Sequence, residues 1–124
     1  MNRHQQRTTL MSAIYQYLLL HKELAEVADD IHDEDPVVNE YFYDVFEKLN
    51  EHEEEYRELI QKNLIDWEFD RLGYIEQSIL LLAVTELKGL SYSKGIVIDE
   101  AVQLAKKYCD DDTYKLINGV LDRL

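Results

Sequence analysis

The sequence predicts an all-α protein, and three observations support that fold class. The composition favours helices over a turn-rich β fold, because the 124 residues include only one proline and four glycines. Apolar residues recur three and four positions apart along most of the chain, which places them on one side of a helix. No linker, repeat or low-complexity segment divides the chain, whose length is ordinary for one domain. We therefore expect a single helical domain over residues 1–124.

The first half of the chain predicts four helical segments. The first begins after the basic tip and ends near His21, and a short second helix carries its apolar stripe over residues 24–31. Pro36 marks the next break, because the residue before a proline disfavours helix. Residues 38–49 then present the widest aromatic face of the protein, and residues 50–64 continue helically after a bend expected at Asn50.

The second half predicts a central helix followed by a helix hairpin. The helix predicted over residues 75–87 contains the stretch 79–84, which is apolar on every side, and it is too short to cross a bilayer. We therefore expect it to be surrounded by other helices and to end at Gly89 in a left-handed turn. A link over residues 90–95 leads to helices at 98–108 and 112–124, with Asp112 as the expected N-cap of the last one. Asn118-Gly119 falls inside the second apolar stripe, so we interpret it as helical, with a packing reason for the glycine.

Charge is distributed unevenly along the chain, whose net charge is −13. Residues 1–22 hold three bases and no acid, residues 23–60 hold fifteen acids and two bases, and the remainder holds eleven acids and eight bases. Such a chain will not bind phosphate backbones indiscriminately, but its small basic end can engage one strand. The acidic middle suits a basic protein partner, and equally a solvated face that keeps the protein in solution.

Side chains suited to catalysis or metal binding are not grouped in any pattern typical of such sites. The histidines at positions 4, 21, 32 and 52 are not spaced as zinc ligands, and only Asp29-x-x-His32 approaches a di-iron motif. The sequence has no glycine-rich phosphate loop and no nucleophile motif around a serine. Cys109 is the single cysteine, so we expect an inert thiol. The sequence therefore predicts a protein that is not an enzyme and uses no cofactor or metal.

The sequence also lacks the segments that direct a protein to a membrane. No apolar run reaches the roughly 18 residues of a transmembrane helix. Residues 3–7 lead into an amphipathic stretch, which is unlike the uniformly apolar core of a signal peptide. We expect a cytoplasmic protein with no membrane partner.

The C-terminal stretch carries the most specific pattern in the chain. It reads IDEAVQLAKKY, then an acidic turn, and then KLINGVLD, and it resembles the C-terminal signature of the NusB family of transcription antitermination factors. Upstream, residues 67–87 read WEFDRLGYIEQSILLLAVTEL and resemble the family's W-x-x-x-R-L-x-x-I pattern. Arg3, Arg7 and Ala13-Ile14-Tyr15 resemble its opening. Residues 22–62 match mainly in length and helical character.

The resemblance implies RNA contacts at two places. Arg3 and Arg7 are four positions apart, so we expect them on one side of the first helix, and in NusB proteins the arginine-rich start contacts boxA RNA. The start of the last helix is the second place, where Leu116 replaces the family's aromatic residue and removes a base-stacking group. The implied RNA-binding residues are Arg3, His4, Arg7, Asp112, Thr113 and Leu116, and the implied partner-binding residue is Glu76.

The fold implied by the resemblance has about seven helices, with an N-terminal group of three packed against a C-terminal group of four. The implied function is that of an antitermination factor that binds boxA-type RNA together with NusE, a ribosomal small-subunit protein, to promote processive transcription of ribosomal RNA operons. Through that complex it would reach other Nus factors and RNA polymerase. Two alternatives are a NusB-like protein-interaction module with little RNA binding, and the NusB-like N-terminal domain of an RNA methyltransferase. Exposed apolar surface intended for NusE could also support a homodimer.

Overall fold

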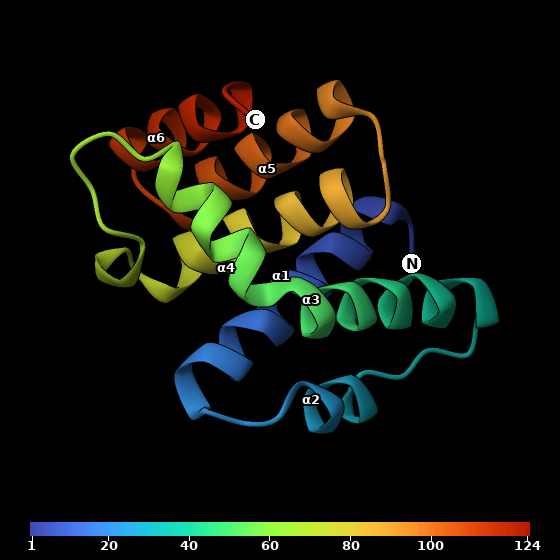
Figure 1. The fold of residues 1–124 in the computed structure, drawn as a ribbon. Coiled ribbons are helices and arrows are strands. Elements are labelled where there is room, and N and C mark those ends of the chain that lie inside the picture. The colour runs from blue at the N-terminus through green and yellow to red at the C-terminus, as the bar shows by residue number, and fades with distance from the viewer.

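The computed structural model describes all 124 residues and contains six α-helices and no β-strand, which confirms the predicted fold class. Figure 1 shows their arrangement around a central helix. The helices are α1 (Arg3–Leu20), α2 (Leu24–Asp30), α3 (Pro36–Lys62), α4 (Tyr74–Val84), α5 (Lys94–Tyr108) and α6 (Asp111–Asp122). A 3₁₀ turn, η1 (Phe69–Arg71), precedes α4, and a π-helical turn, η2 (Thr85–Gly89), continues it. None of the helices combines the length and the apolar character that a membrane span requires.

The helix α3 joins two segments that the sequence analysis separated. It runs without interruption from Pro36 to Lys62, so the bend expected at Asn50 is absent and the count falls from about seven helices to six. Asp35 caps its start by accepting a hydrogen bond from the Val37 N–H at 2.9 Å. Its aromatic-rich face is buried, as predicted. Three N-terminal helices, α1 to α3, therefore pack against three C-terminal ones, α4 to α6.

The helix α1 begins at Arg3, inside the basic tip and not after it as expected. The Asn2 side chain accepts from the Gln5 N–H at 2.8 Å, and the Gln5 side chain accepts from the Asn2 N–H at 2.9 Å. This reciprocal capping box satisfies two backbone donors at the helix start. The basic residues of the tip are consequently held on a helix.

The helix α4 is central, as its uniformly apolar sequence predicts. All residues from Gln77 to Val84 are buried, and α4 contacts α1, α3, α5 and α6. The left-handed turn expected at Gly89 is wrong, because no glycine has a positive φ. A Cβ atom at Gly89 would lie 2.9 Å from the Lys48 Cβ and 2.9 Å from the Tyr56 hydroxyl oxygen, so glycine permits the close approach of α3 to η2.

The helices α5 and α6 form the predicted hairpin, with a different cap. Asp110 is the N-cap of α6, since its carboxylate accepts from the Thr113 N–H at 2.9 Å, and the expectation of Asp112 is wrong. Gly119 lies within α6, as predicted. The Arg123 guanidinium passes 3.3 Å from the position that a Gly119 Cβ would occupy and donates to the Asn63 carbonyl oxygen. A side chain at position 119 would require the end of Arg123 to shift by a few tenths of an ångström.

Candidate functional site

The structure places the predicted site residues in two separate regions. Arg3, His4 and Arg7 lie at the start of α1, beside η2 and the first half of α5. Asp112, Thr113 and Leu116 lie in the first half of α6. Glu76, in the first turn of α4, lines the same hollow as these three residues. In Figure 1 the N-terminus is on the right, whereas α6 begins on the left. The two predicted RNA-contacting groups are thus at opposite ends of the α5–α6 hairpin.

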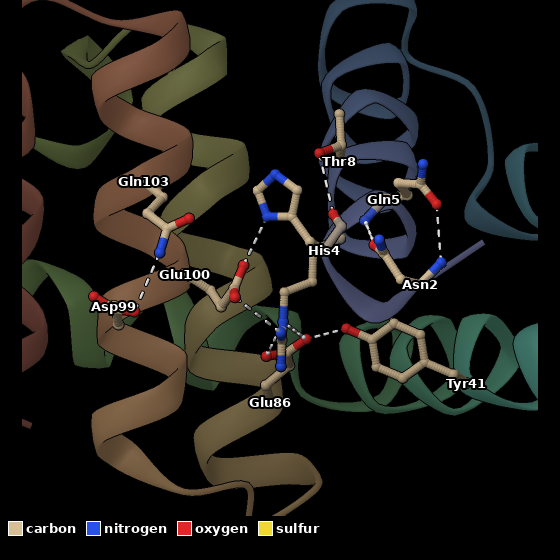
Figure 2. A network of polar contacts seen from close by, with 10 residues as sticks. Asn2, His4, Gln5, Thr8, Tyr41, Glu86, Asp99, Glu100 and Gln103 are labelled. Carbon is tan, nitrogen blue, oxygen red and sulfur yellow. Dashed lines mark hydrogen bonds and ion pairs between the residues drawn. The ribbon is translucent and has the colours of Figure 1, made fainter.

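Arg7 points into the protein and not toward solvent. Its residue is 5% exposed, and its Nε lies 3.0 Å from both carboxylate oxygens of Glu86, which is 1% exposed. The Tyr41 hydroxyl also donates to Glu86, as Figure 2 shows. The expectation that Arg3 and Arg7 project together toward phosphates is therefore corrected for Arg7. It joins α1 to η2 and, through Glu86, to α3.

Burial and the charge of Glu86 have opposite effects on the pKa of Arg7 but the same effect on the pKa of Tyr41. Burial by itself would lower the pKa of Arg7, but the hydrogen bond and the charge of Glu86 outweigh it and raise that pKa. Burial also raises the pKa of Tyr41, and the negative charge of Glu86 raises it further. Arg7 therefore stays charged and Tyr41 stays protonated across the physiological range.

Arg3 and His4 are half-buried, and the Arg3 Nη1 is enclosed without a hydrogen-bond partner. The Arg3 guanidinium carbon lies 3.8 Å from the centroid of the Tyr41 ring, and Tyr92 stacks on that ring at a centroid distance of 6.2 Å. His4 Nδ1 lies 2.9 Å from a Glu100 carboxylate oxygen, and 44% of the His4 side chain is exposed. Figure 2 shows His4 directed toward Glu100. The two side chains are thus positioned by α3 and α5.

The second region is a hollow of about 510 Å³ between the start of α6 and the segment leading into α4. It brings Glu76, assigned to the partner, together with all three α6 residues assigned to RNA. Two further residues were given no role by the sequence: Trp67, which is 53% exposed, and Arg71, whose side chain is 80% exposed. The lining residues are Trp67, Arg71, Leu72, Gly73, Glu76, Asp110, Asp112, Thr113 and Leu116.

The carboxylates of this hollow differ in what they do. Asp110 is committed to capping α6, and its hydrogen bonds from the Thr113 side chain and backbone lower its pKa. Asp112 and Glu76 also line the hollow, and the Glu76 carboxylate folds back over Gly73, where one of its oxygens lies 2.3 Å from the position that a Cβ would occupy. Burial raises the pKa of the neighbouring Cys109 to about 11, with further contributions from Glu76 and Asp110. Its thiol is accordingly protonated, as expected for an inert cysteine.

Comparisons with known proteins agree over the whole chain. The model of the NusB family matches residues 4–124. The chain is 36% identical to the Transcription antitermination protein NusB of a Sulfurovum species, covering 98% of this chain and 96% of that protein. It is 40% identical to the protein of the same name from a Nitratiruptor species, covering 98% of this chain and 90% of that protein.

Solved structures give the same result for the fold. T. maritima NusB superimposes with a TM-score of 0.92 at 28% identity, covering 99% of this chain and 89% of that chain. A crystal structure of the antitermination factors NusB and NusE in complex with dsRNA contains a chain with a TM-score of 0.82 at 31% identity. That match covers 99% of this chain and 96% of the other.

Proposed function

This chain belongs to the NusB family, and from that premise we propose that it is a non-catalytic transcription antitermination factor that binds boxA-type RNA together with NusE. The observation that carries the proposal is the match over 98% of the chain to two antitermination proteins at 36% and 40% identity. A related NusB chain has been crystallised with NusE and dsRNA, which supports both proposed partners. Because such a factor acts on nascent RNA during transcription, the proposal assigns the protein to the cytoplasm.

The proposed mechanism is shared recognition by two subunits. Each subunit offers one RNA surface, and joining them makes the second contact intramolecular, which raises the overall affinity without any new contact. In this chain Arg3 provides the cationic contact with His4 beside it, and Asp112, Thr113 and Leu116 provide the contact at the start of α6.

Partner binding is proposed to depend on charge. Residues 23–60 carry fifteen acids against two bases, so a basic partner is attracted to this part of the chain. Glu76, at the first turn of α4, is the proposed contact on the side facing NusE. RNA, in contrast, is repelled from most of this surface, which confines it to a few positions.

Arg3→Gln tests the RNA role of the basic tip. We expect weaker binding of boxA-type RNA by the complex with NusE, and a log–log salt dependence shallower by about 0.7, since one phosphate contact is lost. Affinity for NusE should not change. Lys22→Gln is the matched control, because Lys22 is a base that lies just beyond the opposite end of α1. An Arg3→Gln complex with wild-type RNA affinity and slope would contradict the assignment.

One observation favours the alternative of a protein-interaction module with little RNA binding. The burial of Arg7 against Glu86 leaves Arg3 as the only arginine of the tip that is not buried. Under this alternative NusE binds normally, but the complex gains no RNA affinity over NusE alone. A titration of RNA with NusE in the presence and absence of this chain separates the two proposals.

A further inference from the structure

Trp67 is exposed although the segment that carries it is firmly anchored. Gln61 at the end of α3 holds this backbone twice, donating to the Trp67 carbonyl at 2.9 Å and accepting from the Phe69 N–H at 2.8 Å. Phe69 is 3% exposed and anchors the segment in the core. Arg123, the residue that follows α6, fixes the start of the same segment by donating to the Asn63 carbonyl oxygen. The Trp67 indole is therefore exposed on a loop whose backbone is held in place by hydrogen bonds.

The backbone immediately before Trp67 supports the same conclusion. Asp66 has a φ of 62°, in the left-handed region that non-glycine residues seldom adopt. Aspartate tolerates this region better than most residues, but it still carries a cost in strain. The turn at Asp66 leaves the Trp67 side chain lining the hollow and not the core.

The chemistry of the hollow suits a nucleic-acid base better than a phosphate. Trp67 offers an aromatic face, and Leu72 and Leu116 are the aliphatic side chains beside it. The carboxylates of Glu76 and Asp112 repel a phosphate, but they accept hydrogen bonds from the N–H groups at a base edge. Arg71 lies in the same lining, and it can exchange its weak, exposed ion pair with Glu68 for the adjacent phosphate.

We propose that this hollow receives one unpaired base of the bound RNA, stacked on Trp67. The inference rests on the proposed RNA-binding function and adds to it a specific residue and contact. Trp67 is the one aromatic side chain that lines the hollow, in which Leu116 stands where the family has an aromatic residue. Unpaired bases commonly stack on aromatic side chains in this way, with little dependence on base identity.

Trp67 is the only tryptophan of the chain, so its fluorescence reports on the hollow directly. We would titrate boxA-type RNA into the preformed complex with NusE and subtract the signal of an identical Trp67→Phe complex. Stacking predicts that RNA quenches the Trp67 emission. Addition of NusE alone should change it much less.

Affinity measurements on variants test the same contact. Trp67→Ala should weaken RNA binding by the complex roughly 5- to 150-fold, the loss expected for one stacked base, whereas Trp67→Phe should retain most of the affinity. Ile65→Ala is the matched control, since Ile65 is 64% exposed in the same loop but does not line the hollow. Adding Leu116→Phe to Trp67→Ala should restore part of the affinity by returning an aromatic ring to the hollow.

The outcomes separate this inference from the function on which it rests. If wild-type complex binds RNA and Trp67→Ala binds it equally well, the stacking inference is wrong and the proposed function stands. If NusE alone changes the emission and RNA does not, the hollow holds a cationic side chain of the partner, which also overturns the inference. If wild-type complex fails to bind RNA at all, the proposed function itself fails. Unchanged thermal unfolding of Trp67→Ala confirms that an affinity loss is local.

Discussion

The buried pair between Arg7 and Glu86 makes a strong prediction for Glu86→Gln. The two residues are 5% and 1% exposed, and the Arg7 Nε lies 3.0 Å from both carboxylate oxygens. Replacing the carboxylate by an amide preserves the shape but leaves the buried guanidinium with only the more distant Glu100 carboxylate, 3.9 Å from Arg7 Nη1, as a counter-charge. Breaking a buried pair in this way costs about 3–5 kcal/mol. That is a large part of the roughly 5–15 kcal/mol by which a typical domain is stable.

Urea unfolding followed by circular dichroism measures this loss directly. Glu68→Gln is the matched control, because it breaks the Arg71–Glu68 pair, whose side chains are 80% and 71% exposed. Exposed pairs contribute about 0–1 kcal/mol, so the control should remain near wild type. The double variant Arg7→Met with Glu86→Leu should recover much of the loss, since it removes both buried charges. A Glu86→Gln protein within about 1 kcal/mol of wild type would refute the reasoning.

Two further predictions concern the start of α6. Asp110→Ala should lower the thermal unfolding temperature while Asp110→Asn and Asp112→Ala should not, because only Asp110 caps the helix and asparagine also caps well. The pKa of Asp110 is lowered from its ordinary value of 3.8, so its carboxylate contributes stability above that pH, and this contribution is lost as the pH falls through the lower pKa of the folded protein. Acid unfolding of the Asp110→Asn protein should not show this pH-dependent loss of stability. Cys109 should react with iodoacetamide at pH 8 about 100-fold more slowly than an unperturbed thiol, because its pKa is raised to about 11 from 9.0. Rapid alkylation of the folded protein would show that the thiol is neither buried nor protonated as described.

Periodicity predicted most of the fold because each helix buries a stripe that is visible in the sequence. The uniformly apolar stretch of α4 required burial on all sides, and the structure places it between four other helices. The errors occurred where local sequence permits several solutions. Asp110 and Asp112 are both plausible caps, and only the position of Thr113 in the folded turn decides between them. The uninterrupted course of α3 past Asn50 likewise depends on its packing.

The candidate site was predicted less completely, and Arg7 shows why. It precedes Leu10 by three residues and Ile14 by seven, so it lies on the apolar stripe of α1, and this spacing was a usable signal of burial. Its partner Glu86 is 79 positions away in sequence, a pairing that no local pattern reveals. Trp67 was visible as the first residue of a recognised motif, but its exposure depends on the turn at Asp66. The burial of Arg7 and the exposure of Trp67 thus depend on long-range contacts and backbone geometry, and not on residue type alone.

The most direct test of the antitermination account is fluorescence anisotropy of labelled boxA-type RNA, titrated with this chain alone, with NusE alone and with both, at two salt concentrations. The account predicts tight binding only when both proteins are present. It also predicts a salt dependence that becomes shallower by about 0.7 on the log–log plot when Arg3 is replaced by glutamine. A complex that forms with NusE but binds RNA no more tightly than NusE alone would contradict the account and leave a protein-interaction module in its place.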